Sequence, residues 1–316
     1  MIVKKPNFWD LEKPNLLAYL LLPFTLIIKI NNFFLSLKKK LLNKNIKSIC
    51  IGNIYLGGTG KTPSTIKIFK ILKKLEKNTV VGKKFYNDQV DEIKLLQKEC
   101  KILTHRTRGK ILKKAQNQNK KIIIFDDGLQ DNTISYNLKI VCFDGKKLIG
   151  NGLLLPSGPL REHIGNLKNY DCLLLKDAGN KINNFTRLAK SINKKLKIFY
   201  TYTYIRNLKK FNKKNKYLIF SGIGNSESFK NLLIKNKFNI IKEIVFPDHF
   251  NYKSEQIEEI KKLSKKLKAK ILTTEKDFLR LNRNYRNNIN FVKIDLIVKN
   301  EKKFVKYLKL KIYEND

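Results

Sequence analysis

A short run of glycines after an apolar segment constrains this chain more than any other feature of its sequence. Residues 48–51 read Ser-Ile-Cys-Ile, an apolar run that is typical of a buried strand. Residues 57–62 read Gly-Gly-Thr-Gly-Lys-Thr, and apolar residues at helical spacing follow to Leu75. Glycines let several backbone N–H groups face one anion, and a helix start adds the positive end of its dipole. The pattern predicts a strand, a phosphate-binding loop and a helix.

The loop departs from the common P-loop spelling, G-x-x-x-x-G-K-[ST], because Tyr55 stands where the first glycine is expected. The spelling GGxGKT is a known variant of that loop. An ordinary glycine-rich turn is the alternative, and the flanking strand and helix favour a nucleotide site. Lys61 is expected to reach the β- and γ-phosphates, and the Thr62 hydroxyl to bind Mg²⁺. The predicted nucleotide-binding residues are Tyr55, Leu56, Gly57, Gly58, Thr59, Gly60, Lys61 and Thr62.

A second apolar run ends in acids. Residues 121–128 read Lys-Ile-Ile-Ile-Phe-Asp-Asp-Gly. A strand of this kind delivers carboxylates at its carboxyl end, beside a Mg²⁺ ion held by Thr62. An aspartate before glycine can also simply begin a turn, but the phosphate loop earlier in the chain favours the metal role for Asp126 and Asp127.

Short, nearly all-apolar strands alternate with helical patterns along most of the chain. This alternation predicts an α/β fold, a P-loop NTPase-like parallel sheet covered on both faces. A lysine-rich stretch at 206–216 reads as a linker, and the alternation resumes beyond it in a second, smaller α/β domain. The predicted parts are an N-terminal apolar segment at 1–40, a P-loop core at 41–210 and a smaller domain at 211–316.

A loop rich in glycine and proline spans residues 150–162 and is too long for a simple connection. Loops of this kind often carry function. Arg161 could clamp a phosphate with two hydrogen bonds. The alternative is a surface ion pair between Arg161 and Glu162.

Residues 16–30, LLAYLLLPFTLIIKI, form the most apolar segment. Pro23 and Lys29 interrupt it, and it is short for a bilayer crossing, which takes about 20 residues. No small-residue cleavage site follows, so a signal peptide is not expected. We expect a helix or helix pair lying in the cytoplasmic face of the inner membrane, and a buried core helix is the alternative. The residues expected at headgroup level are Trp9, Tyr19 and the lysines at 38–40.

The formal net charge of +41 is extreme, but it comes from lysines scattered over all 316 residues. It predicts a surface attracted to anions, whether phosphorylated ligands, acidic lipids or RNA. No basic motif interleaved with aromatic residues supports a nucleic-acid-binding module, so no nucleic-acid partner is expected. The four cysteines have no metal-ligand spacing and are expected to be reduced core residues in the cytoplasm.

Six segments in a fixed order resemble the tetraacyldisaccharide 4'-kinase family of the lipid A pathway. The resemblance extends from the apolar N-terminal segment to the end of the chain. The segments are GNIYLGGTGKTP, FDDGLQD, GNGLLLPSGPLRE, SGIGN, PDHF and TTEKD.

The resemblance implies transfer of the γ-phosphate of ATP to the 4'-hydroxyl of a tetraacylated glucosamine disaccharide 1-phosphate, at the cytoplasmic leaflet. It also implies a P-loop domain and a smaller domain that closes over ATP. Asp91 matches the family's base and His249 its helper. Glu92, Asp126 and Asp127 match the acids around Mg²⁺, and Arg161 matches the arginine of G-P-L-R-E.

Two segments differ from the family pattern. Residues 81–86 replace S-R-G-Y-G, and Val90 and Ile93 replace the glycine and proline that flank the acids. Asp88 is therefore the nearest competitor of Asp91 for the role of base.

Two other functions remain as alternatives. A partitioning-type ATPase uses the same loop but needs a second lysine just before the glycines, where this chain has Leu56. A soluble small-metabolite kinase would not need the apolar N-terminal segment. We expect a monomer whose partners are ATP, Mg²⁺, the lipid substrate and the membrane surface.

Overall fold

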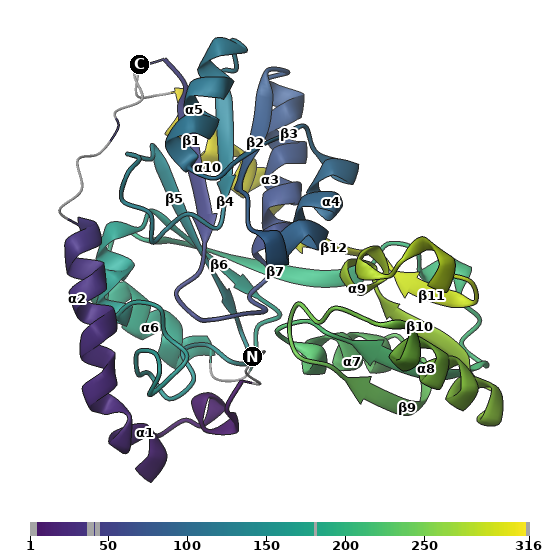
Figure 1. Ribbon diagram of the computed structural model, residues 1–316. Coiled ribbons are helices and arrows are strands. Elements are labelled where there is room, and N and C mark those ends of the chain that lie inside the picture. Colours follow the sequence, from purple (N-terminus) through teal and green to yellow (C-terminus); the bar gives the residue numbers. More distant parts are fainter. Residues whose placement is uncertain (1–4, 37–40, 42–44, 180–181, 314–316) are drawn as a thin grey trace. The chain divides into compact units, whose positions relative to one another are not determined.

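The computed structural model describes residues 5–36, 41, 45–179 and 182–313, which form an α/β protein with two sheets (Figure 1). The chain divides into two compact units. The smaller unit consists of Tyr86–Lys98 and Thr203–Asp295, and the larger unit contains the rest of the described chain. The predicted fold class, an α/β protein with a parallel sheet, is confirmed.

The larger unit is built on an eight-stranded sheet in the order β12-β7-β6-β5-β1-β4-β2-β3. Strands β1 to β7 all pair in parallel. Strand β1 lies between β4 and β5, so the segment after it leaves the sheet where the strand order changes direction, which is where ligands bind in folds of this kind. The strands are β1 (Lys47–Gly52), β2 (Thr79–Lys84), β3 (Ile102–His105), β4 (Ile122–Asp126), β5 (Leu138–Asp144), β6 (Cys172–Lys176), β7 (Lys197–Ile205) and β12 (Ile294–Val298).

Helices α5 and α6 cover one face of this sheet. Ile111 of α5 and Phe185 of α6 are buried in one apolar cluster with Phe125 and Phe143 of the strands. The cluster explains why these helices carry their apolar residues on a single stripe. The helices of the larger unit are α1 (Leu16–Leu20), α2 (Thr25–Ser36), α3 (Lys61–Leu75), α5 (Arg108–Asn117), α6 (Ile182–Ile192) and α10 (Glu301–Tyr313).

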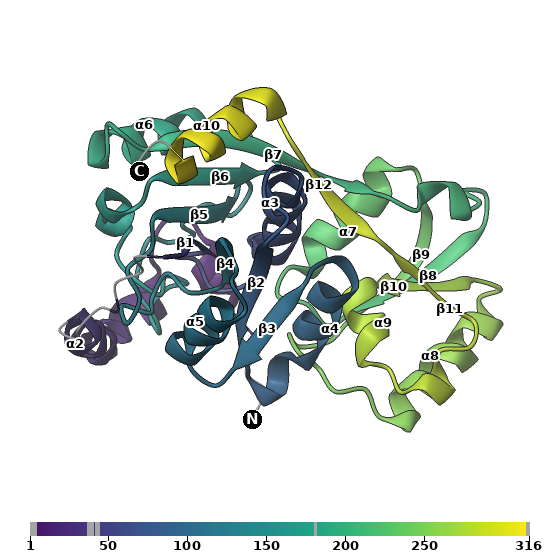
Figure 2. The same ribbon diagram turned by 90° about the horizontal axis from the view of Figure 1, so that it is seen from above.

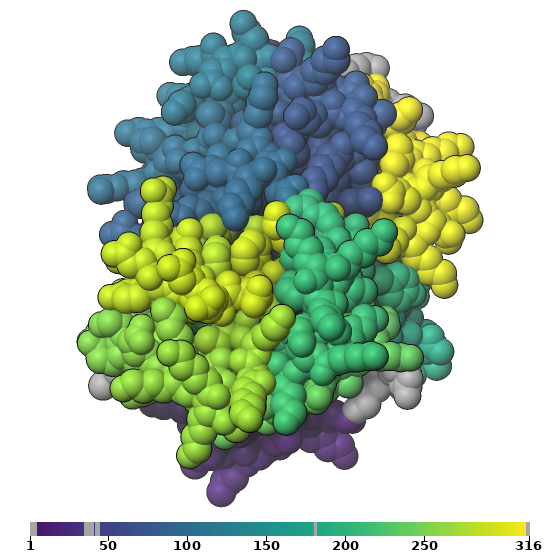
Figure 3. Space-filling model, turned by 90° about the vertical axis from the view of Figure 1, so that its right-hand side faces the viewer, coloured from purple at the N-terminus to yellow at the C-terminus, as the bar shows by residue number. Residues whose placement is uncertain are grey.

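Helices α3 and α10 cover the opposite face. Phe199 lies between Ile198 and Tyr200, which pack on the cluster of α5 and α6, so its ring points away from that cluster. The centroid of the Phe199 ring is 4.8 Å from that of Phe304 in α10. An ion pair of 2.8 Å joins α3 to α10, and Figures 2 and 3 show α10 (yellow) beside the segment that contains α3.

The smaller unit contains a four-stranded parallel sheet in the order β11-β10-β8-β9. Ile219 of β8 packs with Phe229 of α7, whereas Phe220 packs with Ile257 of α8. Helices α7 and α8 therefore cover opposite faces. The elements are α4 (Val90–Glu99), β8 (Lys216–Ser221), α7 (Ser226–Lys235), β9 (Asn239–Val245), α8 (Ser254–Lys266), β10 (Lys270–Thr274), α9 (Glu275–Arg280) and β11 (Ile289–Val292).

The two compact units are interleaved along the sequence and so differ from the expected division into 41–210 and 211–316. Helix α4 belongs to the smaller unit, and α10 belongs to the larger one. The reason lies in long-range contacts, such as that of Phe304 with Phe199, which no local pattern reveals.

The apolar N-terminal segment forms a helix pair, α1 and α2, separated by a 3₁₀ turn at Leu22–Phe24 that contains Pro23. Within the described residues, no helix is long and apolar enough to cross a membrane. Leu16 and Ile27 are 75% and 64% exposed, so a buried core helix is wrong for this segment.

The expectation that Trp9 lies at headgroup level is also wrong. Its side chain is buried, and its indole N–H donates a hydrogen bond of 2.9 Å to the Pro156 carbonyl. The lysines at 38–40 lie outside the described residues.

Replacing Phe304 by alanine tests the role of α10. We expect Phe304→Ala to lower the free energy of unfolding by about 3–5 kcal/mol, because it removes a fully buried ring and leaves a cavity. Leu310→Ala, in the same helix at a residue 41% exposed, is the control and should change stability far less. Urea denaturation measures both, and equal losses would contradict the burial of α10 on the sheet.

Candidate active site

The loop after β1 has the backbone shape that its glycines predict. Gly57, Gly58 and Gly60 have φ angles of 86°, 43° and 85°, in the left-handed region that favours glycine. Gly60 directly precedes α3, which begins at Lys61. The Thr59 hydroxyl is buried and has no hydrogen-bond partner among the described residues. Because such a group is costly to bury unpaired, this loop suits a polar ligand such as a phosphate.

Lys61 points to the end of the neighbouring strand. Its ammonium lies 2.7 Å from Oδ2 of Asp127 and 3.0 Å from Oδ1 of Asn53. Asn53 is fully buried, and its amide holds the Lys61 side chain over the loop. Sequence analysis did not assign a role to Asn53, although it lies in the G-N-I segment that carries the family resemblance.

Asp127 is held by its backbone and by two cations. Its φ of 58° lies in the left-handed region, which few residues other than glycine adopt. Its backbone N–H donates to the Ile51 carbonyl, and its backbone carbonyl accepts a hydrogen bond from the Arg108 side chain. Nη1 of Arg161 lies 3.0 Å from Oδ1. Burial alone would raise the pKa of this carboxyl, but Lys61 and Arg161 hold it well below its usual range. Asp127 is thus an ionised carboxylate at neutral pH.

Asp126 is fully buried and has donors on both oxygens. Oδ1 accepts from the Thr65 hydroxyl of α3, and Oδ2 from the Lys83 ammonium of β2, each at 2.8 Å. Lys83 is 1% exposed, so the pair is a buried ion pair between neighbouring strands. Asp126 therefore links the helix of the phosphate loop to the sheet. Sequence analysis missed Lys83, which lies in the segment that departs from the family pattern.

Arg161 does not pair with its neighbour, so the alternative of a surface ion pair with Glu162 is wrong. Glu162 is buried and accepts hydrogen bonds from Asn166, Gln130 and the hydroxyl of Tyr170. Gln130 also accepts from Arg161, at 3.4 Å. The two charges of this dipeptide thus have separate roles: Glu162 fixes the loop, and Arg161 binds Asp127.

Asp91 lies in the first turn of α4, in the smaller unit, and is buried. Its Oδ2 is 2.7 Å from Arg280 and 3.8 Å from the Lys276 ammonium, both in α9. Its Oδ1 is 3.5 Å from Nδ1 of His249. Burial by itself would raise the pKa of Asp91, but the imidazole and the two cations lower it to about 2.

His249 follows β9 in a backbone conformation that is rare for this residue type, with a φ of 57°. The backbone N–H of His249 donates to the Gly222 carbonyl at 3.2 Å. Its Nδ1 is buried and has no hydrogen bond to the described residues. The structure thus brings Asp91 and His249 together as predicted, whereas the competitor Asp88 is exposed.

The TTEKD segment, residues 273–277, supplies Lys276, and Arg280 follows it by three residues in the same helix. Asp277, fully buried, accepts hydrogen bonds from Thr274 at 2.7 Å and from Tyr252 at 2.9 Å, and pairs with Arg280 at 2.9 Å. Burial raises the pKa of Asp277 in spite of these partners. Sequence analysis quoted this segment but assigned no role to Lys276 or Arg280, because their partner lies far away in the sequence.

The predicted metal ligands are divided between the units. Thr62, Asp126 and Asp127 lie in the larger unit, and Glu92 lies in the smaller one, 2.9 Å from Lys276. The described residues contain no cluster of three or more histidines, cysteines or acids that could bind a metal alone. The oxygen donors of Thr62, Asp126 and Asp127 in the larger unit fit Mg²⁺, which commonly takes one or two carboxylates and completes its shell with phosphate and water.

Comparison with known proteins decides the family. The model of the family described as tetraacyldisaccharide-1-P 4'-kinase matches residues 15–313. The chain is 44% identical over 302 residues to a tetraacyldisaccharide 4'-kinase of Pelagibacter ubique, covering 96% of both chains. It is 32% identical to one of Rickettsia akari, covering 93% of both.

This chain belongs to the tetraacyldisaccharide-1-P 4'-kinase family. A crystal structure of LpxK from Aquifex aeolicus in complex with ATP has the same fold, with a TM-score of 0.69 and 21% identity over 94% of this chain and all of that one. The resemblance stated from six short segments is confirmed. Family membership also decides against the partitioning-type ATPase and the nucleic-acid-binding module.

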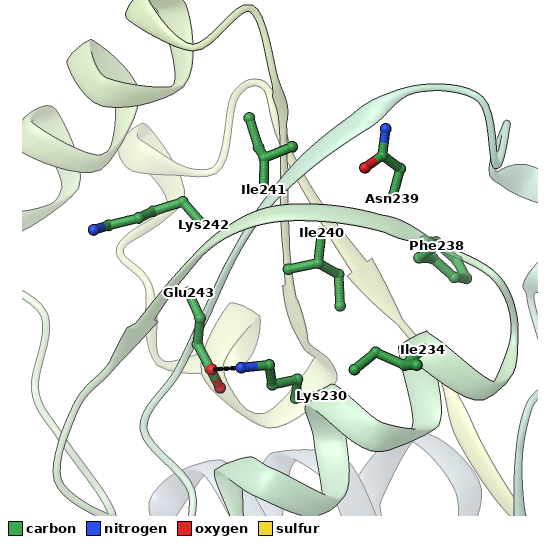
Figure 4. Close-up of a pocket in the computed structure, with 8 residues that line it drawn as sticks. All are labelled: Lys230, Ile234, Phe238, Asn239, Ile240, Ile241, Lys242 and Glu243. Atoms are coloured by element: carbon green, nitrogen blue, oxygen red, sulfur yellow. Dashed lines mark hydrogen bonds and ion pairs between the residues drawn. The ribbon is translucent and has the colours of Figure 1, made fainter.

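A groove elsewhere in this kinase contains none of the predicted site residues. It has a volume of about 350 Å³ and lies between α7 and β9, where Lys230 pairs with Glu243 at 2.7 Å (Figure 4). Its lining residues are Lys230, Ile234, Phe238, Asn239, Ile240, Ile241, Lys242 and Glu243.

Replacing Arg280 tests the electrostatics around Asp91. We expect Arg280→Gln to raise the pKa of Asp91 from about 2 toward its ordinary value near 4, because the closest cation is removed. Carboxyl ¹³C NMR of aspartate-labelled protein follows the titration.

The same change should alter how the free energy of unfolding depends on pH. The lowered pKa of Asp91 stabilises the folded state at pH values above the ordinary pKa of an aspartate, and this contribution is lost as the pH falls from about 4 to about 2. The variant should lose less stability over that window than the original chain. Arg283→Gln, at an exposed residue of the same unit, is the control and should leave the pKa of Asp91 unchanged.

Proposed function

We propose that this chain transfers the γ-phosphate of ATP to the 4'-hydroxyl of a tetraacylated glucosamine disaccharide 1-phosphate. The observation that carries the proposal is the family match over residues 15–313. The phosphate loop adds to it, because its Lys61 and the distant Arg161 converge on Asp127. ATP as donor is supported by the LpxK structure of the same fold, which holds ATP.

The larger unit supplies the grip on the phosphates. Backbone N–H groups of residues 57–62 face the anion, and the buried Thr59 hydroxyl gains a partner. When the nucleotide binds, Lys61 and Arg161 leave Asp127 and bind phosphate oxygens instead. The Asp127 carboxylate then becomes available. Thr62, Asp126 and Asp127 are the residues of this unit proposed to hold Mg²⁺. The ion supplies charge neutralisation on the transferred phosphoryl group.

The smaller unit supplies the proton acceptor. With a pKa of about 2, Asp91 is ionised at neutral pH and ready to accept a hydrogen bond from the sugar hydroxyl. A carboxylate of such low pKa is a weak base. It therefore takes the proton only as the bond to phosphorus forms, when the hydroxyl has become acidic. His249, 3.5 Å away, is the group to which the proton can pass next.

We also propose that α1 and α2 dock on the cytoplasmic face of the inner membrane, where the acylated substrate resides. Isolated exposed apolar residues are common on soluble proteins, but a continuous group of this size marks an interaction surface. The charge of +41 adds attraction to anionic lipids. The exposed residues of this group, which we name the apolar face, are Leu16, Leu17, Tyr19, Leu20, Leu22, Phe24, Leu26, Ile27, Ile30, Phe33 and Phe34.

We propose a monomer as the working form, since all the residues assigned above come from one chain. Sedimentation of the detergent-solubilised protein measures this directly.

A transfer assay tests the reaction. Purified protein is incubated with labelled ATP, Mg²⁺ and the disaccharide 1-phosphate lipid in detergent, and label should appear on the lipid. Label on a soluble sugar instead would support a small-metabolite kinase and contradict the proposal.

Asp91→Ala should reduce transfer by a factor on the order of 100 or more while leaving ATP affinity nearly intact, because it removes the proton acceptor but no phosphate contact. Asp88→Ala, three residues earlier, is the matched control and should retain activity. The opposite result for the two variants would move the base to Asp88.

Vesicle co-sedimentation tests the membrane docking. Ile27→Ser combined with Phe33→Ser should weaken binding to phosphatidylglycerol-containing vesicles, because two exposed apolar side chains of α2 are lost. Ile234→Ser with Val245→Ser, exposed residues of the smaller unit, should bind as the original chain does. Equal binding by both double variants would exclude the apolar face as the docking surface.

A further inference from the structure

The loop at 150–161 encloses the segment that precedes α1. The Trp9 carbonyl accepts from the Asn151 N–H at 3.0 Å, and the Trp9 indole donates to the Pro156 carbonyl at 2.9 Å. A Cβ atom at Gly150 would lie 2.1 Å from the Trp9 carbonyl oxygen, so only glycine permits this approach. The glycines of this long loop are therefore explained in part by the fit of residues 8–10 against it.

The same segment reaches the phosphate loop through Asp10. The Asp10 carboxylate accepts hydrogen bonds from the Tyr55 hydroxyl, from Lys5 and, at 3.0 Å, from Lys147. Tyr55 is buried and stands at the start of the predicted nucleotide-binding loop. Residue 10 is thus fixed to the phosphate loop by a hydrogen bond to an ionised acceptor, which is stronger than a neutral one.

The phosphate loop and the segment of Arg161 are themselves joined by backbone hydrogen bonds. The Leu56 N–H donates to the Pro159 carbonyl, and the Arg161 N–H donates to the Ile54 carbonyl, each at 2.8 Å. Residues 8–10, 54–56 and 159–161 therefore form one hydrogen-bonded unit within the larger unit of the chain.

A second contact reaches Arg161 from the apolar face. The Asn32 side chain in α2 donates to the Arg161 carbonyl at 3.2 Å. The next two residues, Phe33 and Phe34, are each 61% exposed and belong to the apolar face. The helix proposed to enter the lipid surface is thus bonded to the backbone of a phosphate-binding arginine.

We propose that Asp10 and Asn32 are positioning residues that couple contact of the apolar face with a lipid surface to the nucleotide site. They flank the apolar segment on both sides, one bonded to Tyr55 and the other to Arg161. A lipid surface that holds α1 and α2 in place orders both contacts, so less ordering remains to be done when the nucleotide binds. The kinase then binds nucleotide more tightly on a membrane than in solution. This inference rests on the membrane docking proposed above.

The one tryptophan of the chain, Trp9, provides the measurement. Energy transfer from Trp9 to a methylanthraniloyl derivative of a non-hydrolysable ATP analogue, with Mg²⁺, reports nucleotide binding. We expect the Kd to fall about fivefold or more when phosphatidylglycerol-containing vesicles are added, as for typical allosteric coupling. Because coupling of binding energies is reciprocal, the unlabelled analogue should tighten vesicle binding by the same factor.

Adjacent asparagines provide matched variants. Asn32→Ala should bind vesicles and, without vesicles, bind nucleotide as the original chain does, but its Kd should no longer respond to vesicles. Asn31→Ala, at an exposed residue of the same helix, should keep the response. Asp10→Ala, at the other contact, should also lose the response.

The outcomes separate the two proposals. Failure of the original chain to bind vesicles would overturn the membrane docking and, with it, the coupling. Vesicle binding without a change in the nucleotide Kd would overturn the coupling alone. An equal vesicle response in Asn32→Ala and Asn31→Ala would overturn the assignment of Asn32.

Discussion

The carboxylate of Asp127 is the group on which the larger unit's site depends, because it brings two cations from distant parts of the chain to one point. Lys61 belongs to the phosphate loop, and Arg161 lies in a long loop that begins about ninety residues later. Without the Asp127 carboxylate between them, the positive charges of Lys61 and Arg161 would repel each other. The pairing keeps them side by side in the arrangement that a triphosphate needs. Preorganised charge of this kind is the largest contribution of most enzymes to phosphoryl transfer.

The smaller unit also places a carboxylate among cations, but here the cations hold the carboxylate in place. The low pKa of Asp91 follows from its hydrogen bond with His249 and from the charges of Lys276 and Arg280. A free carboxylate would be the stronger base. The chain instead holds Asp91 firmly ionised and correctly oriented, which suits a reaction in which the proton leaves the hydroxyl late. Orientation by Arg280 depends in turn on Asp277, whose oxygens are fixed by Thr274 and Tyr252.

The local sequence pattern predicted the helices and strands well, but it did not predict which side chains pair with one another. The strand at 48–51, the glycine loop and the helix to Leu75 depend on near neighbours in sequence, and all three form as expected. The roles of Lys83 and Arg280 depend on partners 43 and 189 residues away, Asp126 and Asp91. The role of Asn53 depends on how the loop returns Lys61 to it, eight residues later. Trp9 shows the same limit: an aromatic residue beside an apolar helix suits a membrane interface, but a loop some 140 residues later buries it.

Strands β7 and β12 are neighbours in the eight-stranded sheet. The segment Thr203–Asp295, which begins near the end of β7 and ends near the start of β12, makes up most of the smaller unit. The points where the chain leaves and re-enters the larger unit are therefore close together, as in a domain insertion. A short turn joining the two strands would preserve the order of the sheet and leave α10 in place on its face. The insertion carries His249 and Arg280 but not their partner Asp91, which lies in the separate segment Tyr86–Lys98. A related chain that exchanged this insertion would therefore have to keep a surface that binds the same carboxylate.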